Sequence, residues 1–235
     1  MPRYRLVSFK SCPWVQRVAI VLREKAIDFE FQHIEADNRP DWFRPISPHN
    51  KVPVLRIDDA TALFESGAIC EYLDEIHAPR LHPDDPIERA LNRAWIEHMP
   101  AFMNVISAHA YAMGEADYAK AAAQIPAAFE KLEQAIGVQH AKGKGDGPFF
   151  NGARYSLVDA SYAPFLQRHL FLERIKKLGH IDKFPRVRAW AEAIVARQTT
   201  HSFPPAEYEA MYRDMVKRRN AWMSQFVDNP KAAAE

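Results

Sequence analysis

Cys12 stands directly before Pro13, where a short apolar run gives way to a helical spacing of apolar residues. Pro13 suits the first position of a helix, because its missing N–H would have no partner there, and this places Cys12 at the N-cap. The amides of Trp14 and Val15 would then point at the sulfur, and the helix dipole adds about half a positive charge nearby. Such sites lower the pKa of a cysteine from about 8.5 to as low as about 3.5. We therefore expect Cys12 to be a reactive thiol.

The second of the two cysteines, Cys70, falls at an apolar helical position within GAICEYL, and we expect it in the core. A C-x-x-C pair would let a second thiol resolve a mixed disulfide, but Val15 occupies that place. A disulfide on Cys12 must therefore be resolved by an outside thiol. Two cysteines do not make a disulfide framework, which indicates a reducing cytoplasm. Glutathione is the obvious outside thiol in that compartment.

The stretch NKVPVL, residues 50–55, could hold an extended peptide such as glutathione. Pro53 opens an apolar strand, and a proline cannot donate to a strand ladder, so it marks an edge or a strand start. Val52 is pushed toward extended geometry by the proline that follows it. Its backbone amide and carbonyl are then free to pair with a peptide by strand addition.

The stretch FESGAI, residues 64–69, has the chemistry to recognise a γ-glutamyl group. Ser66 can cap a helix that runs from Gly67, and the N-terminus of a helix binds carboxylates. Glu65, just before it, supplies the opposite charge for an amine. Ordinary helix capping, which needs Ser66 alone, explains this pattern equally well.

The elements that must position these residues fall into two halves. The first is expected to contain strands at residues 3–9, 28–34, 53–58 and 62–64 and helices at residues 13–26 and 66–77. This order, βαβ followed by ββα, predicts an α/β domain with a right-handed crossover. After a proline-rich linker at 78–88, helices are expected at residues 86–113, 117–140, 157–173, 185–198 and 205–226. Pro100 should kink the first of them.

Two features of the helical half are expected to be structural. In YSLVDA, residues 155–160, Ser156 and Asp159 stand three apart and form a variant capping box with Asp in place of Glu or Gln. The glycine-rich stretch at 140–152 follows a helix and fits neither dinucleotide-binding nor P-loop spacing. We expect it to be a connector.

Composition excludes several classes of function. Apolar residues make up 48% and charged residues 26% of the 235 residues, as in soluble globular proteins. The formal net charge of +1 provides no field for nucleic acid or an anionic membrane. The chain has no apolar run long enough to span a bilayer and no signal peptide, so a cytoplasmic protein is expected. The ten histidines show no ligand-spaced cluster, and no metal is predicted.

The motifs CPWVQR, KVPVL, ESGAICEYLDE and SLVDA together make the whole chain resemble the cytosolic glutathione transferases. Within that family, SCPWVQR, PDWF and EYLDEIHAPRLHPDDP most resemble the omega class and its bacterial relatives, which use a catalytic cysteine in place of tyrosine or serine. The resemblance implies an α/β plus all-α fold. A thioredoxin-like, glutathione-binding domain would cover 1–78, a linker 79–86 and an all-helical domain 87–228.

The resemblance also implies roles for matching residues. Cys12 would form the mixed disulfide with glutathione, Val52 would pair with the cysteinyl backbone, and Pro53 would be a cis-proline. Glu65 and Ser66 would hold the γ-glutamyl end.

The basic partner of the glycyl carboxylate is less clearly marked. Arg39, just before PDWF, matches a basic position of the family near that carboxylate, and Lys51 is its rival. Trp14 replaces the phenylalanine usual after CP and would alter the pocket beside the thiol. Ser11 precedes Cys12 and suggests a serine-type enzyme, but Cys12 holds the cap position.

The leading hypothesis is a glutathione-dependent thiol transferase or reductase, with glutathione as co-substrate and no metal. A lyase or conjugating transferase acting on aryl substrates, and a non-catalytic interaction module, are the alternatives. The partner would be a small hydrophobic or disulfide co-substrate, and the family implies a homodimer. Several large side chains are either core or part of a pocket between the domains: Trp95, Phe102, Met103, Tyr111, Trp222 and Phe226.

Overall fold

The computed structural model describes residues 4–143 and 147–229. Its first half contains β1 (Tyr4–Ser8), α1 (Pro13–Glu24), β2 (Phe29–His33), the 3-10 helix η1 (Asp41–Ile46), β3 (Val54–Arg56), β4 (Ala62–Phe64) and α2 (Ser66–Ile76). The strands form one sheet in the order β2-β1-β3-β4. β1 runs parallel to β2 and antiparallel to β3, which is antiparallel to β4. The predicted βαβ–ββα order is confirmed.

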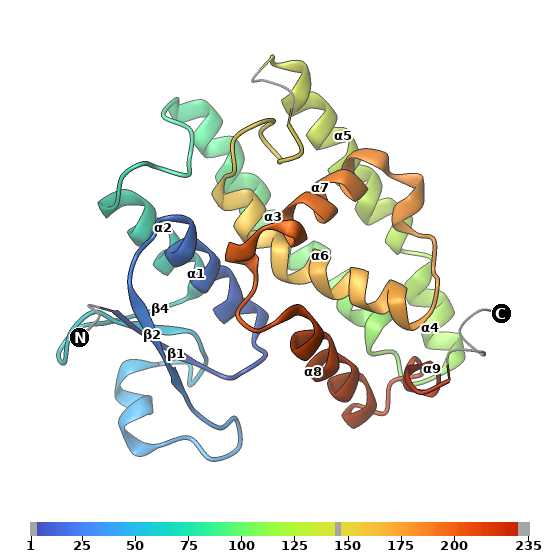
Figure 1. Cartoon of the computed structure of the whole chain (residues 1–235), viewed down its shortest axis with the longest axis horizontal. Helices are drawn as coiled ribbons and strands as arrows, with labels where there is room; N and C mark the ends of the chain where they lie inside the picture. The colour runs from blue at the N-terminus through green and yellow to red at the C-terminus, as the bar shows by residue number, and fades with distance from the viewer. Residues whose placement is uncertain (1–3, 144–146, 230–235) are drawn as a thin grey trace.

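The second half is helical. It contains α3 (Pro86–Ala110), α4 (Glu115–Ala122), α5 (Ile125–Ala141), α6 (Leu157–Ile175), the 3-10 helix η2 (Ile181–Lys183), α7 (Pro185–Ala196), the 3-10 helix η3 (Gln198–Thr200), α8 (Pro205–Arg218) and α9 (Ser224–Val227). Figure 1 shows the sheet on one side of the molecule and these helices on the other. None of the described helices is long and apolar enough to cross a membrane. The predicted connector at 140–152 includes residues 144–146, which lie outside the described part of the chain.

Two predicted helices are divided in the structure. The helix expected at 117–140 is interrupted between α4 and α5, where Pro126 occupies the first turn of a new helix. Proline lacks the N–H that a continuous helix would need at this point. The helix expected at 205–226 ends at Arg218, and Asn220, with φ of 49°, turns the chain toward α9. α3 runs through Pro100 without ending.

Helix α1 joins the two halves. Its consecutive residues Val18, Ala19, Ile20, Val21 and Leu22 are all completely buried. A helix that is buried all round must be covered on several faces, and α1 packs on β1, α2 and α6. The larger hydrophobic cluster accordingly runs from the sheet into the helical half without interruption. The start of α1, where Cys12 lies, is therefore fixed relative to both halves.

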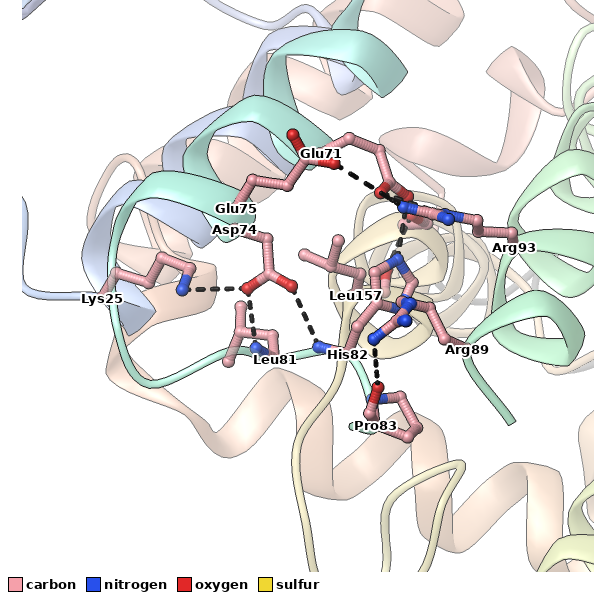
Figure 2. Close-up of polar contacts among 11 residues, drawn as sticks. Lys25, Glu71, Asp74, Glu75, Leu81, His82, Pro83, Arg89, Arg93 and Leu157 are labelled. Atoms are coloured by element: carbon pink, nitrogen blue, oxygen red, sulfur yellow. Dashed lines mark hydrogen bonds and ion pairs between the residues drawn. The ribbon is translucent and has the colours of Figure 1, made fainter. Parts of the chain in front are cut away.

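The linker is anchored by Asp74 on α2 (Figure 2). Its carboxylate accepts hydrogen bonds from the backbone amides of Leu81, at 2.7 Å, and His82, at 3.1 Å. The Nζ atom of Lys25, just after α1, lies 2.9 Å from the same carboxylate. Because Asp74 and Lys25 are almost fully buried, the three segments are held together away from solvent.

Glu71, one turn earlier on α2, extends this junction to α3 (Figure 2). Its carboxylate lies 2.8 Å from Nε2 of His82 and 2.6 Å from Nη2 of Arg93. Burial raises the pKa of Glu71, but hydrogen bonds from His82 and Arg93 outweigh it and lower the pKa to about 2. Glu71 is therefore held as a carboxylate that ties the linker to both domains.

The predicted capping box at the start of α6 is confirmed. Asp159 accepts from the amide of Ser156 at 2.7 Å and from its hydroxyl at 2.6 Å. The other oxygen of Asp159 accepts from the amide of Phe150 at 2.8 Å and from Nε1 of Trp190 at 2.6 Å. The box thus also fixes the preceding loop and α7 to α6, which local spacing does not indicate.

Candidate functional site

Cys12 occupies the N-cap of α1, as predicted, with φ of −74° and ψ of 122°. The thiol is half-buried, and in the described structure it makes no capping hydrogen bond. Burial raises the pKa of Cys12, while the amides of Val15 and Trp14 and the charge of Arg168 act in the opposite direction without cancelling it. The expected net lowering of this pKa is therefore wrong. The helical half removes water from the sulfur, and desolvation disfavours the thiolate.

A buried polar network supports the segment that carries Cys12. Arg168 on α6 donates from Nη2 to the carbonyl oxygen of Ser11 at 2.7 Å. Its Nη1 atom lies 3.3 Å from Oε1 of Gln16, which also accepts from the hydroxyl of Tyr208 at 2.7 Å. These contacts come from α6 and α8, more than 150 residues away in sequence. Sequence reasoning missed them, and no local pattern indicates them.

A cavity of about 400 Å³ lies between the two halves. Six of the predicted glutathione-binding residues line it: Trp14, Lys51, Val52, Pro53, Glu65 and Ser66. Ile96 and Pro100 of α3 form part of the opposite wall. Cys12 lines a separate, narrow recess of about 10 Å³ beside Gln16 and Tyr208. The structure therefore brings most of the predicted site together and leaves the sulfur in a constricted position.

The loop before β3 has the conformation that the family resemblance implied. The Val52–Pro53 peptide bond is cis, and the ladder between β1 and β3 begins only at Val54. Ser47 fixes the loop, because its hydroxyl donates to the carbonyl oxygen of Lys51 at 2.8 Å and accepts from the amide of Lys51 at 2.9 Å. This places Val52 and Pro53 side by side on the cavity wall.

Glu65, and not Ser66, is the N-cap of α2. The helix begins at Ser66, the first residue of the predicted range 66–77, so Ser66 is its first residue and not its cap. Glu65 has φ of 62° and ψ of 110°. Holding the backbone of a residue other than glycine in such a sparsely populated region costs about 1–3 kcal/mol. With the backbone in this conformation, Glu65 and Ser66 both line the cavity.

Arg17 adds a positive charge to the same cavity, and sequence reasoning missed it. It is buried, and its Nε atom has no hydrogen-bond partner among the described residues. A Cβ atom at Gly67 would lie 2.9 Å from its Nη2 atom, so glycine leaves room for the guanidinium. The signal in the sequence is a charged residue within the apolar run VQRVAIVL. Together, Arg17 and Glu65 offer both charges that a zwitterionic group needs.

The two candidate bases for a second carboxylate are placed differently. Lys51 is exposed and lines the cavity. Arg39 is not among the lining residues of this cavity in the described structure, and its guanidinium lies 5.5 Å from the ring centre of Phe9. The geometry therefore favours Lys51, while the role assigned to Arg39 stays a prediction.

Cys70 lies in the core, as predicted. It is 6% exposed, and its Sγ atom is 4.0 Å from the carbonyl oxygen of Arg17. Burial raises the pKa of Cys70 to about 11. Its thiol is therefore protonated and enclosed at neutral pH.

Two of the large side chains considered for a second-substrate pocket belong clearly to hydrophobic clusters. Phe102 is 2% exposed, and its ring lies 5.4 Å from that of Tyr162. Trp222 packs against Tyr118 and Phe226, at 4.3 and 5.0 Å between ring centres, in a second cluster near the C-terminus. Phe102 and Trp222 therefore contribute to packing.

A group of possible metal ligands lies outside the cavity. His169, Glu173 and His180 place one ligand atom each within 4.8 Å of one another. The expectation that the histidines form no ligand-spaced cluster is wrong here. His169 and Glu173 are four residues apart on one helix face, and the turn after α6 brings His180 back to them.

Two protein-family models match this chain. Residues 6–81 match the family model described as "Glutathione S-transferase, N-terminal domain", and residues 93–193 match "Glutathione S-transferase, C-terminal domain". Glutathione S-transferase omega-1 of Rattus norvegicus is 31% identical over 187 residues, covering 79% of this chain and 74% of that protein. Glutathione S-transferase L1 of Arabidopsis thaliana is 31% identical over 194 residues, covering 80% and 76%.

Solved structures agree with these relatives. Glutathione transferase Omega 3C from Trametes versicolor superposes with a TM-score of 0.74 at 25% identity, covering 87% of this chain and 91% of that one. Rice GST1 (OsGSTU1), solved in complex with glutathione, superposes with a TM-score of 0.75 at 25% identity, covering 92% and 97%. The arrangement of sheet, linker and helices is thus shared along almost the whole chain.

Proposed function

The chain belongs to the glutathione S-transferase family, and from that premise we propose that it is a glutathione-dependent thiol transferase that works through a mixed disulfide at Cys12. The observation that carries this proposal is the position of Cys12 at the start of α1, where the buried Arg168 donates a hydrogen bond to the carbonyl oxygen of the preceding Ser11. The similarity of the chain to omega-class proteins supports the same assignment.

The cavity residues suggest how glutathione would bind. The backbone of Val52 would pair with the cysteinyl residue, as an added strand pairs with a sheet edge. Glu65 would hold the amine of the γ-glutamyl end, and Ser66 with the first amides of α2 would hold its carboxylate. Arg17 is buried, lines the same cavity and offers a positive charge to that carboxylate. Lys51 would serve the glycyl carboxylate.

The reaction would consist of two thiol–disulfide exchanges. The Cys12 thiolate attacks the glutathionyl sulfur of a mixed disulfide, a Cys12–glutathione bond forms, and the partner leaves as a thiolate that takes a proton from water. A second glutathione, as thiolate, then attacks the glutathionyl sulfur on Cys12. Glutathione disulfide leaves, and the Cys12 thiolate is restored. Arg168 and the amides of α1 would stabilise that thiolate, whereas burial opposes it.

The cellular setting and assembly are part of the same proposal. A cytoplasmic location would supply reduced glutathione. A homodimer is implied by the family, and the chain has exposed apolar side chains that could contribute to a subunit contact, among them Ile87, which is 72% exposed, and Phe64, which is 40% exposed. Sedimentation analysis of the purified chain would measure the assembly directly.

Intact-mass analysis after treatment with glutathione disulfide tests the mechanism. The wild type should gain one glutathione, Cys70→Ala should gain the same adduct, and Cys12→Ser should gain none. Binding to immobilised glutathione separates an enzyme from an interaction module that has lost the ligand. An adduct on Cys70, or full thiol-transferase activity of Cys12→Ser, would refute the proposed role of Cys12.

A further inference from the structure

The group formed by His169, Glu173 and His180 lies in the helical half. His169 and Glu173 are one turn apart on α6, and His180 directly precedes η2. His169 is completely buried, and the other two are half-buried. Gly179, with φ of 66°, makes the turn that returns the chain to α6. Three side chains capable of binding a metal are thus brought together by one short connection.

The backbone orients the carboxylate of Glu173. Its Oε2 atom accepts hydrogen bonds from the amides of Leu178, at 2.9 Å, and Gly179, at 3.1 Å. The Oε1 atom is buried, has no hydrogen bond within the described structure, and lies 3.4 Å from Nε2 of His169. One oxygen is therefore anchored and the other is presented to the histidines, as in carboxylates that serve as metal ligands.

Five ring nitrogens of three neighbouring imidazoles are buried without a hydrogen bond to any described residue. Both ring nitrogens of His169 and of His109 on α3 are buried without a hydrogen bond to any described residue, and so is Nδ1 of His180. The rings of His109 and His180 are 5.3 Å apart between centres. Buried polar atoms are normally satisfied, so a group of such nitrogens in one place indicates a bound ion or water.

We propose that His169, Glu173 and His180 bind a Zn²⁺ ion. Two imidazoles and one carboxylate form a ligand set typical of zinc, and the fourth position stays open to water or to a small movement of His109. Zinc bonds of about 2.0–2.1 Å place tetrahedral ligand atoms about 3.3 Å apart. His169 and Glu173 have nearly this spacing already. His180 would move inward, which its position in a connecting turn allows.

Such an ion would join the end of α6 to the turn before η2. Arg168, which supports the Cys12 segment, directly precedes His169 on α6. An ion held by His169 would therefore also stabilise the part of α6 that carries Arg168, without itself touching the substrate.

Zinc titration of the full-length, chelator-stripped chain tests the proposal, with calorimetry in competition with a chelator of known affinity. One Zn²⁺ per chain should bind and raise the melting temperature. Glu173→Gln and His180→Gln should each weaken binding at least tenfold, because even residues that only orient ligands change metal affinity by about 10–100-fold. His180→Gln changes a half-buried turn residue, so it keeps the test decisive if Glu173→Gln does not fold.

Two control variants separate this site from other ligands. His98→Gln alters a histidine on α3 outside the group, and Cys12→Ser removes the half-buried thiol at the start of α1; both variants should bind zinc like the wild type. Co²⁺ in place of Zn²⁺ should give the visible spectrum of a four-coordinate site, and His180→Gln should change it. The proposal is overturned if the wild type binds no zinc at stoichiometric concentration, if folded His180→Gln binds it unchanged, or if Cys12→Ser abolishes binding.

Discussion

Arg168 donates a 2.7 Å hydrogen bond from Nη2 to the carbonyl oxygen of Ser11, the residue directly before Cys12. The donor belongs to the helical half and the acceptor to the loop after β1. Arg168 is 6% exposed, so its charge acts in a poorly screened environment. The reactive thiol is therefore positioned by both halves of the chain.

Replacing Arg168 by Met should raise the pKa of Cys12 further, because the charge that opposes desolvation is lost. We expect slower alkylation of Cys12 at neutral pH and a loss of stability of about 1–3 kcal/mol, since buried acceptors lose a charged donor. The pH dependence of iodoacetamide alkylation measures the first effect, and denaturant unfolding measures the second. Arg213→Met on α8 is the control and should leave the alkylation profile in place; an unchanged profile for Arg168→Met would contradict the role of Arg168.

The two cysteines should respond to pH differently. Burial raises the pKa of Cys12, so the thiol dominates at neutral pH and the thiolate appears as pH rises through that raised value. Alkylation of Cys12 should therefore accelerate with pH and reach half its maximum above the pKa of an ordinary cysteine. Cys70, with a pKa of about 11 and 6% exposure, should react only after unfolding. Peptide mapping of alkylated protein distinguishes the sites, and a low-pH plateau for Cys12 would contradict the effect of burial.

Glu65→Ala and Ser66→Ala should each weaken glutathione binding by about 1–3 kcal/mol, the cost of removing one partner from a charge-assisted hydrogen bond. Calorimetric titration with glutathione measures this loss. Lys51→Ala and Arg39→Ala form a matched pair for the glycyl carboxylate. Because Lys51 lines the cavity and Arg39 does not, the lysine variant should lose more affinity. If all four variants bind glutathione with the affinity of the wild type, this cavity is not the glutathione site.

Glu71→Gln should destabilise the protein at neutral pH. The pKa of Glu71 is lowered to about 2 in the folded chain, against about 4.3 in an unfolded one. A lowered carboxyl pKa contributes stability above pH 4.3 that is lost as pH falls toward 2. The side chain is 28% exposed and its partner Arg93 47%, so solvent reduces the effect to about 1–2 kcal/mol. Unfolding free energies at several pH values should converge for wild type and variant near pH 2.

Local signals in the sequence determined much of this protein. The Cys12–Pro13 start of α1, the capping box of Ser156 and Asp159, and the position of Cys70 were all predicted correctly. Each depends on residues within one or two turns of each other, where caps and hydrophobic spacing act directly. The order of elements along the first half, βαβ followed by ββα, followed from the alternation of short strands and helices. The same local rules misjudged α4 and α5, because Pro126 starts a new helix inside an apparently continuous pattern.

Tertiary structure alone decided the environment of the chemistry. Arg168 reaches Ser11 across 157 positions of sequence, and the burial that raises the pKa of Cys12 comes from packing of the two halves. Arg17 lines the cavity because Gly67 on another helix leaves it space, and His180 joins His169 and Glu173 only through the turn at Gly179. Sequence spacing specifies which residues can cap or share a helix face. Desolvation and contacts between distant segments depend on how those elements pack, and no local pattern contains that information.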